Sequence, residues 1–443
     1  MIDKYNKYFF LKLIDEIILY ISMLKLKKNE FISIEKYFNK NLFFLGLKWL
    51  SNQIFYPQFY WYNRNGKEEN SAIGMLKSFN SINDAEFFLL QHLKYPNLRI
   101  WGLNGWNSIG NDISNKVKQK STFYFLPRLE IFRFNLNITF ILNINGKNDI
   151  LNTINFLQKL RFLSNSKFEL SINVISKKYN PNYQEWFNLL TKAIKEIKTG
   201  KIKKIVLARE VKINLSSTVS VVKILFFNKK KNYNCYHFMI AFNKNLGFIS
   251  STPERLYLRK GKKLFSEALA GTIDNDINKN ISKKQSYFLM KNEKSQLENL
   301  IVANDICKQL QNIVSSLYVS KPTIIKLCKI QHLCRSINAT LIKSLDSICL
   351  LRLQPTAAVC GFPRKNSRVF LLRNEPFDRN WYAGTGGFIS LNKSEFAVSL
   401  RCAQIKKTQI FLYSGAGILD NSDPNEEWKE IEKKIFTLKS LFE

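Results

Sequence analysis

The sequence lacks three features that would assign it to common classes of protein. None of its seven cysteines belongs to a Cys-x-x-Cys pair, which argues against the usual zinc motifs and indicates a reducing compartment. No apolar run reaches the roughly 20 residues that a transmembrane helix needs. The apolar stretch over residues 9–24 is broken by Lys12, Asp15 and Glu16, so it does not have the pattern of a signal peptide. These absences predict a soluble, cytoplasmic protein without a membrane partner.

Acidic residues are also scarce. The chain has 34 Asp and Glu against 68 Lys and Arg, which gives a formal net charge of +34. A charge of this sign is typical of proteins that bind nucleic acid. The lysines are scattered, however, and Asn, Ile, Phe and Tyr, whose codons are also rich in A and T, are abundant with them. We therefore expect no nucleic-acid partner; a non-catalytic basic binding protein is the alternative from a different class.

No repeat or low-complexity linker divides the chain, and strands and helices do not alternate regularly. Asn65-Gly66 is a hairpin-turn signal, and the lysine run 229–231 is expected in a solvated loop. The mixture predicts an α+β fold with a large β-sandwich-like core and surrounding helices. Hydrophobic periodicity predicts helices over residues 5–50, 183–197, 292–310 and 426–441 and short strands elsewhere, including 168–174, 369–372 and 395–404.

The segment from residue 414 to residue 430 combines a glycine turn with an acidic helix start. Gly415 and Gly417 let a ligand approach the backbone because they have no Cβ atom. Glu427 and Glu430 are three residues apart and share one helix face. Paired carboxylates of this kind suit Mg²⁺, although a solvated helix N-terminus with acidic residues near the positive end of the dipole is the alternative.

Two further ionisable residues lie at strand ends. Lys204 begins an apolar strand, where desolvation favours the neutral amine that a base requires; a surface lysine is the alternative. Glu254 lies in a turn that enters a strand, where it is a candidate acid. The alternative is that Glu254 forms a salt bridge with Arg255 or Arg259 and has no catalytic role.

One carboxylate stands in an apolar context. Glu298 lies between Leu297 and Leu300 on a predicted apolar helix stripe, which indicates a carboxylate that is paired or bound to metal. The small-residue turn 268–272 could admit a ligand, but on its own it is a weak signal.

Together these segments resemble the chorismate-utilising enzyme family, which includes isochorismate, anthranilate, aminodeoxychorismate and salicylate synthases. The resemblance runs in order from about residue 185 to residue 437. It implies the fold of that family, with residues 1–180 as an amino-terminal part packing on the core and 181–443 as the chorismate-binding catalytic region. The segments that carry it are 204–209, 248–256, 268–272, Glu298, 331–333, 353–363, 379–387, 398–401 and 413–430.

Within the family, the sequence is most similar to the isochorismate synthases of menaquinone type. Lys204 stands where members that add ammonia typically have glutamine. Ala270 stands where aminodeoxychorismate synthases often carry a nucleophilic lysine. A salicylate synthase, or an isochorismate synthase of a siderophore pathway, is the alternative.

The amino-terminal part agrees with the menaquinone type through the segments 56–61, 72–74 and 125–128. Two positions depart from the wider family. Gln354 replaces a usual histidine, and Cys360 replaces a frequent glycine. Glutamine is tolerated in menaquinone-type members. The departure therefore favours that subtype and leaves the expected activity unchanged.

The resemblance implies Mg²⁺-dependent conversion of chorismate to isochorismate, by addition of water at C2 and loss of the C4 hydroxyl. It makes Lys204 the base and Glu254 the acid, whose pKa must be raised to hold a proton near neutral pH. Glu298 and Glu430 are the implied metal ligands, with Glu427 acting through water. No glutamine amidotransferase subunit is expected. The implied substrate-binding residues are Ala270, Gly271, Thr272, His332, Tyr382, Arg401, Gly415, Gly417 and Lys434.

Overall fold

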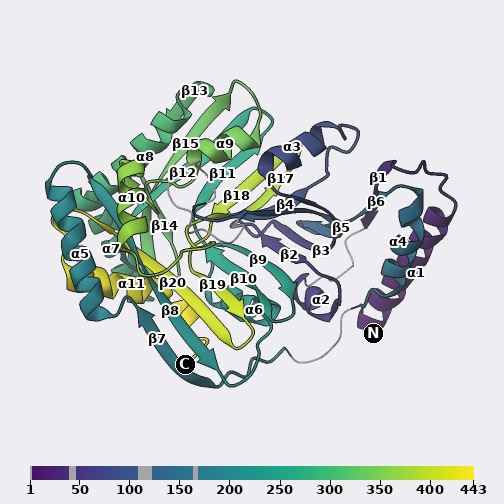
Figure 1. The fold of residues 1–443 in the computed structure, drawn as a ribbon, viewed down its shortest axis with the longest axis horizontal. Helices are drawn as coiled ribbons and strands as arrows, with labels where there is room; N and C mark the ends of the chain where they lie inside the picture. The colour runs from purple at the N-terminus through teal and green to yellow at the C-terminus, as the bar shows by residue number, and fades with distance from the viewer. Residues whose placement is uncertain (1, 39–45, 108–121, 163–167) are drawn as a thin grey trace.

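The computed structural model describes residues 2–38, 46–107, 122–162 and 168–443 (Figure 1). The helices are α1 (Ile2–Ser22), α2 (Gly46–Asn52), α3 (Ile82–Leu90), α4 (Ile150–Gln158), α5 (Tyr183–Lys198), α6 (Val221–Lys231), α7 (Lys279–Lys291), α8 (Glu293–Leu310), α9 (Asp346–Leu353), α10 (Arg364–Asn374) and α11 (Pro424–Lys439), with a 3₁₀ turn at Lys147–Asp149. The strands are β1 (Phe31–Phe38), β2 (Gln58–Tyr62), β3 (Glu68–Phe79), β4 (Ile100–Asn104), β5 (Phe123–Phe134), β6 (Asn137–Asn145), β7 (Val174–Asn180), β8 (Lys204–Leu215), β9 (Tyr236–Asn243), β10 (Leu246–Thr252), β11 (Arg255–Lys260), β12 (Lys263–Asp274), β13 (Val314–Val319), β14 (Thr323–Lys326), β15 (Ile330–Leu341), β16 (Gly361–Phe362), β17 (Thr385–Ile389), β18 (Lys393–Val398), β19 (Cys402–Lys406) and β20 (Gln409–Ile418).

Antiparallel pairing joins these strands into one sheet with two arms that face each other. One arm runs β15–β12–β11–β18–β17–β4, and the other runs β3–β2–β9–β10–β19–β20–β8–β7. Strand β5 pairs with both β4 and β3 and so connects the arms. The ring of Trp61 on β2 packs against Phe238 of its own arm and against Phe388 of the other. Apolar side chains thus fill the space between two antiparallel layers, and the predicted α+β, sandwich-like fold is confirmed.

Strands from the first 180 residues belong to this same sheet. Strand β2 pairs with β9, with Phe59 opposite Ile240. Strand β4 pairs with β17, with Gly102 opposite Gly387. Strands β2 and β3 form the hairpin expected at Asn65-Gly66, where Gly66 has a φ of +74°. The boundary near residue 180 stays a prediction.

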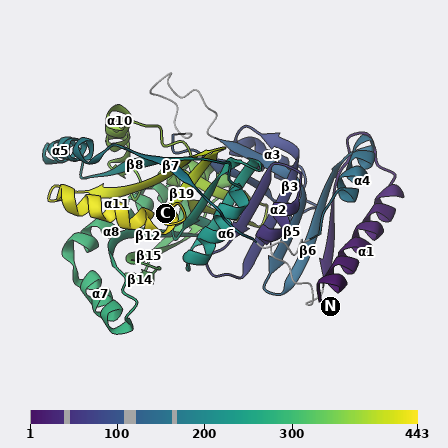
Figure 2. The same cartoon turned by 90° about the horizontal axis from the view of Figure 1, so that it is seen from below.

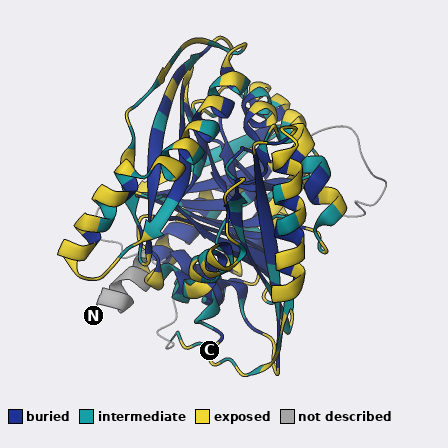
Figure 3. Cartoon of the chain, turned by 90° about the vertical axis from the view of Figure 1, so that its left-hand side faces the viewer, coloured by how far each residue is buried: buried dark blue, intermediate teal, exposed yellow. Residues whose placement is uncertain are grey.

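Helices cover the outer faces of the sheet, with their buried sides inward (Figures 2 and 3). Helix α5 begins with a capping box between Asn182 and Glu185, which satisfies free N–H groups at its start. Helix α11 begins at Pro424, and Asp423 accepts hydrogen bonds from two of its backbone N–H groups. Both helices contact β8 or β20, and α8 packs on β12. In the described residues, no helix is long and apolar enough to cross a membrane.

The amino-terminal region differs from the helix predicted over residues 5–50. Helix α1 ends at Ser22, and β1 follows, paired with β6. The residues of β1 partly alternate between apolar and polar, and such a period identifies a strand; the stronger helical pattern before it concealed the change. The strand expected over 168–174 is also wrong, because β7 begins only at Val174.

Three predictions further along the chain are corrected. Residues 369–372 lie in α10 and not in a strand, since a four-residue apolar run cannot distinguish the two. The lysine run 229–231 forms the last turn of α6, and Lys229 reaches inward to donate a hydrogen bond to Tyr60 Oη. The strand expected over 395–404 is divided into β18 and β19 at Arg401, whose φ is +46°. An arginine in this region is uncommon, so the local sequence could not indicate the break.

Candidate active site

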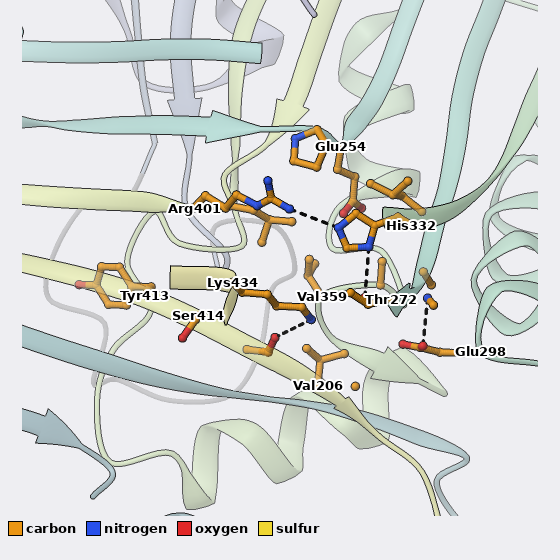
Figure 4. Close-up of a pocket in the computed structure, with 18 of the residues that line it drawn as sticks. Val206, Glu254, Thr272, Glu298, His332, Val359, Arg401, Tyr413, Ser414 and Lys434 are labelled. Atoms are coloured by element: carbon orange, nitrogen blue, oxygen red, sulfur yellow. Dashed lines mark hydrogen bonds between the residues drawn. The ribbon is translucent and has the colours of Figure 1, made fainter. Parts of the chain in front are cut away.

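A cavity of about 730 Å³ lies where β8, β12, β15, β20, α8 and α11 meet (Figure 4). It brings together segments that are far apart in the sequence. Among the described residues that line it are most of the side chains predicted for the site: Glu254, Ala270, Gly271, Thr272, Glu298, His332, Tyr382, Arg401, Gly415, Gly417 and Lys434.

Lys204 lies against this cavity, behind Gly417. It is the first residue of β8, and only 1% of it is exposed. Its Nζ lies 2.9 Å from Glu298 Oε1. A Cβ atom on Gly417 would fall 2.9 Å from Lys204 Cε, so the absence of a side chain there gives the lysine its place. Ser367 Oγ donates a hydrogen bond of 3.0 Å to the main-chain oxygen of Lys204, which fixes the strand start.

Glu298 projects from α8 into the cavity and is held at both carboxylate oxygens. Oε1 faces Lys204, and Oε2 accepts a hydrogen bond of 3.0 Å from the backbone N–H of Gly271. Burial raises the pKa of Glu298, but the positive charges of Lys204 and Lys434 outweigh it and hold the pKa below its usual value. Glu298 is therefore a carboxylate at neutral pH.

The helix face that positions Glu298 is not the one predicted. Leu297 and Leu300 are 55% and 41% exposed, so they do not form a buried stripe. The buried side of α8 carries Val302, Ile306 and, unexpectedly, Asn299. The amide of Asn299 donates hydrogen bonds to three backbone oxygens of β12 and β15, at 2.9–3.1 Å. Sequence reasoning missed Asn299, because nothing in the local pattern distinguishes a buried amide from an exposed one.

Glu254 is a buried carboxyl on the other side of the cavity. It is 3% exposed, and its backbone is fixed by hydrogen bonds to Thr252 Oγ1 at 3.2 Å and from the N–H of Val398 at 3.0 Å. Burial raises the pKa of Glu254 to about 8, although the charges of Lys204 and Lys434 act in the opposite direction. Glu254 therefore holds a proton at neutral pH, which is the state that a general acid requires.

The alternative explanation for Glu254, a salt bridge to a neighbouring arginine, is wrong. Arg255 pairs with Glu267, at 3.1 Å. Arg259 pairs with Asp346, at 2.6 Å. Both arginines therefore form ion pairs with other carboxylates. The carboxyl of Glu254 points into the cavity (Figure 4).

His332 on β15 links two other predicted residues. Arg401 Nη2 lies 3.3 Å from His332 Nε2, and Thr272 Oγ1 lies 3.1 Å from Nδ1. Burial and the positive charges of Arg401 and Lys434 hold the pKa of His332 well below its usual value, so the ring is neutral. Arginine can only donate, so Nε2 is the acceptor and Nδ1–H donates to Thr272. The histidine thus orients the Arg401 guanidinium and leaves the threonine proton free to face the cavity.

The two glycines of β20 present main-chain groups to the cavity. Gly415 and Gly417 lie opposite Ala208 and Val206 of β8. The N–H groups of Ala208 and Val206 donate away from β20, to Glu375 and to the oxygen of residue 360. These are therefore the pairs whose backbone groups point away from each other, and the N–H groups of both glycines face the edge that β19 does not cover.

Tyr382 and Lys434 close this edge. The ring of Tyr382 stacks on Tyr413, with centroids 5.3 Å apart. A Cβ atom on Gly415 would fall 2.6 Å from Tyr382 Oη, so only glycine fits there. Lys434 Nζ lies 3.0 Å from the main-chain oxygen of Gly415 and 2.5 Å from Glu430 Oε1. Glu430 and Lys434, four residues apart on α11, thus form an ion pair at the edge of the site.

Glu427 and Glu430 lie beside the main cavity, in a neighbouring hollow that shares Thr272 and Lys434 with it. Glu427 is 4% exposed and accepts a hydrogen bond of 2.7 Å from Ser422 Oγ. Burial and the charge of Glu430 raise the pKa of Glu427 to about 7. Each carboxylate also has a lysine beside it, since Lys294 Nζ lies 3.5 Å from Glu427 Oε1 and Lys434 pairs with Glu430.

Glu298, Glu427 and Glu430 are the carboxylates near the cavity that could supply oxygen ligands to a divalent cation. In the part of the chain that the structure describes, no three His, Cys, Asp or Glu side chains converge on one point. Glu298 and Glu430 instead each face a lysine ammonium group, at 2.9 and 2.5 Å. Positive charge is therefore already stabilised beside both carboxylates, and carboxylate oxygens are the ligands that Mg²⁺ prefers.

Several residues that shape the cavity were not predicted individually. They are small or apolar and include Val206, Leu269, Val359, Leu400 and Ser414. Each lies within or next to a segment that carries the family resemblance, which is the only signal that could have found them. Gln354, the departure from the family pattern, is buried beside Gly105 and Thr385 and hydrogen-bonds to both, at 2.7 Å each.

Comparison with known proteins identifies the family of the chain. The chain is 40% identical over 405 residues to "Isochorismate synthase MenF" of Escherichia coli, an alignment that covers 90% of this chain and 91% of the relative. It is 35% identical over 400 residues to the protein of the same name from Haemophilus influenzae, which covers 89% of both chains. The solved structure of the Escherichia coli protein, described as the menaquinone-specific isochorismate synthase, superposes with a TM-score of 0.91 at 37% identity, over 97% of this chain and 99% of that one. A family model described as "Chorismate binding enzyme" matches residues 109–443, and the chain belongs to this family.

Proposed function

We propose that this chain is an isochorismate synthase of menaquinone biosynthesis, which converts chorismate to isochorismate with Mg²⁺. The observation that carries the proposal is the pairing of a buried amine with a buried, protonated carboxyl around one cationic cavity. Lys204 is 1% exposed and Glu254 is 3% exposed, and the cavity between them carries Arg401 and Lys434. The high identity to proteins named isochorismate synthase supports the same activity.

The reaction exchanges one hydroxyl for another. Lys204 acts as the base and takes a proton from water, and the hydroxide forms a bond to C2 of the chorismate ring. The double bonds shift, and the C–O bond at C4 breaks. Glu254 gives its proton to the departing hydroxyl, which leaves as water. One water enters and one leaves, so the reaction is an isomerisation.

Cationic and donor groups around the cavity hold the two carboxylates of the substrate. Arg401 offers two parallel N–H donors, a geometry that matches a carboxylate, and His332 holds it in place. Lys434, the Tyr382 hydroxyl and the N–H groups of Gly415 and Gly417 supply the remaining contacts. Ala270, Gly271 and Thr272 leave room for the ring, because none has a long side chain.

Glu298, Glu430 and Glu427 would hold Mg²⁺, the last of them through water. The cation would neutralise the ring carboxylate and fix the ring. We further infer that the enzyme acts in the cytoplasm and without a glutamine amidotransferase subunit. All seven cysteines are free, as expected in a reducing compartment, and the nucleophile is water and not ammonia.

Product analysis tests the proposal. Purified protein is incubated with chorismate and Mg²⁺, and the products are separated by chromatography. Isochorismate as the product is the expected result, with loss of turnover when the metal is chelated. Salicylate with pyruvate, or anthranilate when ammonia is added, would overturn the assignment. Restored menaquinone synthesis in a bacterium lacking its own isochorismate synthase tests the pathway.

A further inference from the structure

A second cavity lies between α5 and α10, which are neighbours in Figures 1 and 2. It has about 1,060 Å³ of empty space, part of it open to solvent. Five of its lining residues are cations: Lys192 and Lys195 on α5, Lys201 in the turn before β8, and Lys365 and Arg373 on α10. None of these residues belongs to the proposed active site.

The charge of this cavity exceeds the basic background of the chain. Lys and Arg make up five of its eleven lining residues, against 68 of 443 in the whole sequence. Glu196 is its single acidic lining residue. None of the five cations forms an ion pair with another residue in the described ranges. All five side chains are exposed, so water and salt screen their mutual repulsion in part, and a bound anion would reduce it further.

The floor of the cavity is apolar. Ile202 is 3% exposed and Phe370 is 8% exposed, and Val369 lies beside them. A ring of cations around such a floor fits a ligand that has an apolar or flat body and more than one negative charge. Phosphate groups satisfy this best, since each carries between one and two negative charges at neutral pH and lysine binds them as a point charge. We propose that this basic cavity binds a phosphorylated small molecule of about the size of a nucleotide.

The cavity is connected to the catalytic lysine through the main chain. Asn366, a lining residue, donates a hydrogen bond of 3.0 Å to the oxygen of Lys201. The next residue, Ser367, donates to the oxygen of Lys204 at 3.0 Å. Helix α10 thus holds the strand start that carries the base. A ligand that bridges Lys201 and α10 acts on this segment, and this second part of the inference rests on the proposed function.

Calorimetric titration tests the binding site. Pyrophosphate and ADP are the probes, in metal-free buffer because Mg²⁺ binds phosphates. We expect a Lys365→Ala/Arg373→Ala variant to bind ADP at least about tenfold more weakly than wild type. A Lys283→Ala/Lys284→Ala variant is the matched control, since it removes the same charge from exposed positions on α7. Absence of binding by wild type, or equal weakening in both variants, would overturn the site.

Tighter binding of ADP than of pyrophosphate supports a role for the apolar floor, and equal affinities would refute that role.

Initial rates test the connection to Lys204. Chorismate is varied with and without ADP at constant free Mg²⁺. We expect kcat to change while KM for chorismate stays within about twofold, because the cavity contacts the turn that leads into the strand of the base and not the carboxylate-binding groups. The effect should disappear in the Lys365→Ala/Arg373→Ala variant. A rise in KM alone that persists in this variant would place ADP in the chorismate cavity and overturn the inference. Failure to turn over chorismate at all would refute the proposed function and leave the titration result standing.

Discussion

Burial of Glu254 makes the stability of the protein depend on pH in a way that one substitution can isolate. Burial raises the pKa of this carboxyl from 4.5 to about 8, so the folded state keeps a proton that the unfolded state loses. The stability that this provides is complete below about pH 4.5 and is lost as the pH rises to about 8. At about 1.4 kcal/mol for each pKa unit, the total loss approaches about 5 kcal/mol.

Glu254→Gln removes this dependence, because the amide is nearly the same size and stays neutral. Between pH 5 and pH 8, the free energy of unfolding of the variant should rise by about 3 kcal/mol relative to wild type. Urea unfolding followed by tryptophan fluorescence measures the difference. Glu16→Gln, at an exposed position on α1, provides the baseline for changes that do not come from the cavity. A difference between the Glu254→Gln variant and wild type that stays constant over this pH range would refute the reasoning.

The proton on Glu254 is also the one that the proposed reaction transfers to the departing hydroxyl. Wild-type kcat should fall as the pH rises through about 8, since the acid is then ionised. Glu254→Gln should lose turnover at every pH although it becomes relatively more stable. Opposite effects on stability and activity distinguish a buried catalytic acid from a residue that only supports the fold. A variant that kept wild-type turnover would refute the acid role.

Three further substitutions test the site. Lys204→Ala should abolish water addition while the protein still folds, and the exposed neighbour Lys203→Ala should not; chorismate turnover and circular dichroism measure both, and wild-type turnover by Lys204→Ala would exclude the base role. Glu298→Gln should lose the response of activity to Mg²⁺, whereas Glu293→Gln, exposed on the same helix, should keep it; an unchanged metal titration would remove Glu298 as a ligand. Ala270→Lys should block or redirect the reaction by placing an ammonium group in the cavity, and full activity would show that this turn does not face the ring.

From the sequence, the residues that line the cavity were easier to predict than the contacts that hold them in place. Lys204 and Glu254 stood out because a charge at the end of an apolar strand contradicts the local pattern, but only the family resemblance implied their roles as base and acid. A spacing of four residues on one helix is enough to bring Glu430 and Lys434 together as an ion pair. These signals are local, so one sequence contains them.

The remainder depends on contacts between distant segments. Asn299 anchors α8 to two strands through its amide, but nothing in the local sequence indicates that this amide is buried. Arg401 reaches His332 from a backbone conformation that an arginine rarely adopts. The N–H groups of Gly415 and Gly417 face the cavity because of the register between β20 and β8. Register is set by tertiary pairing, and no short stretch of sequence determines it.

The charges around the cavity explain why substrate and metal belong together in the proposed reaction. Glu254 holds a proton and His332 is neutral, so the cations Lys204, Arg401 and Lys434 are opposed by Glu298, Glu430 and a partly protonated Glu427. The positive and negative charges of these residues therefore nearly cancel. A dicarboxylate alone would add two negative charges, and a divalent cation alone would add two positive ones, each at the cost of separating ion pairs that lie at 2.5–2.9 Å. Added together, they leave the total charge unchanged, and each therefore lowers the cost of binding the other.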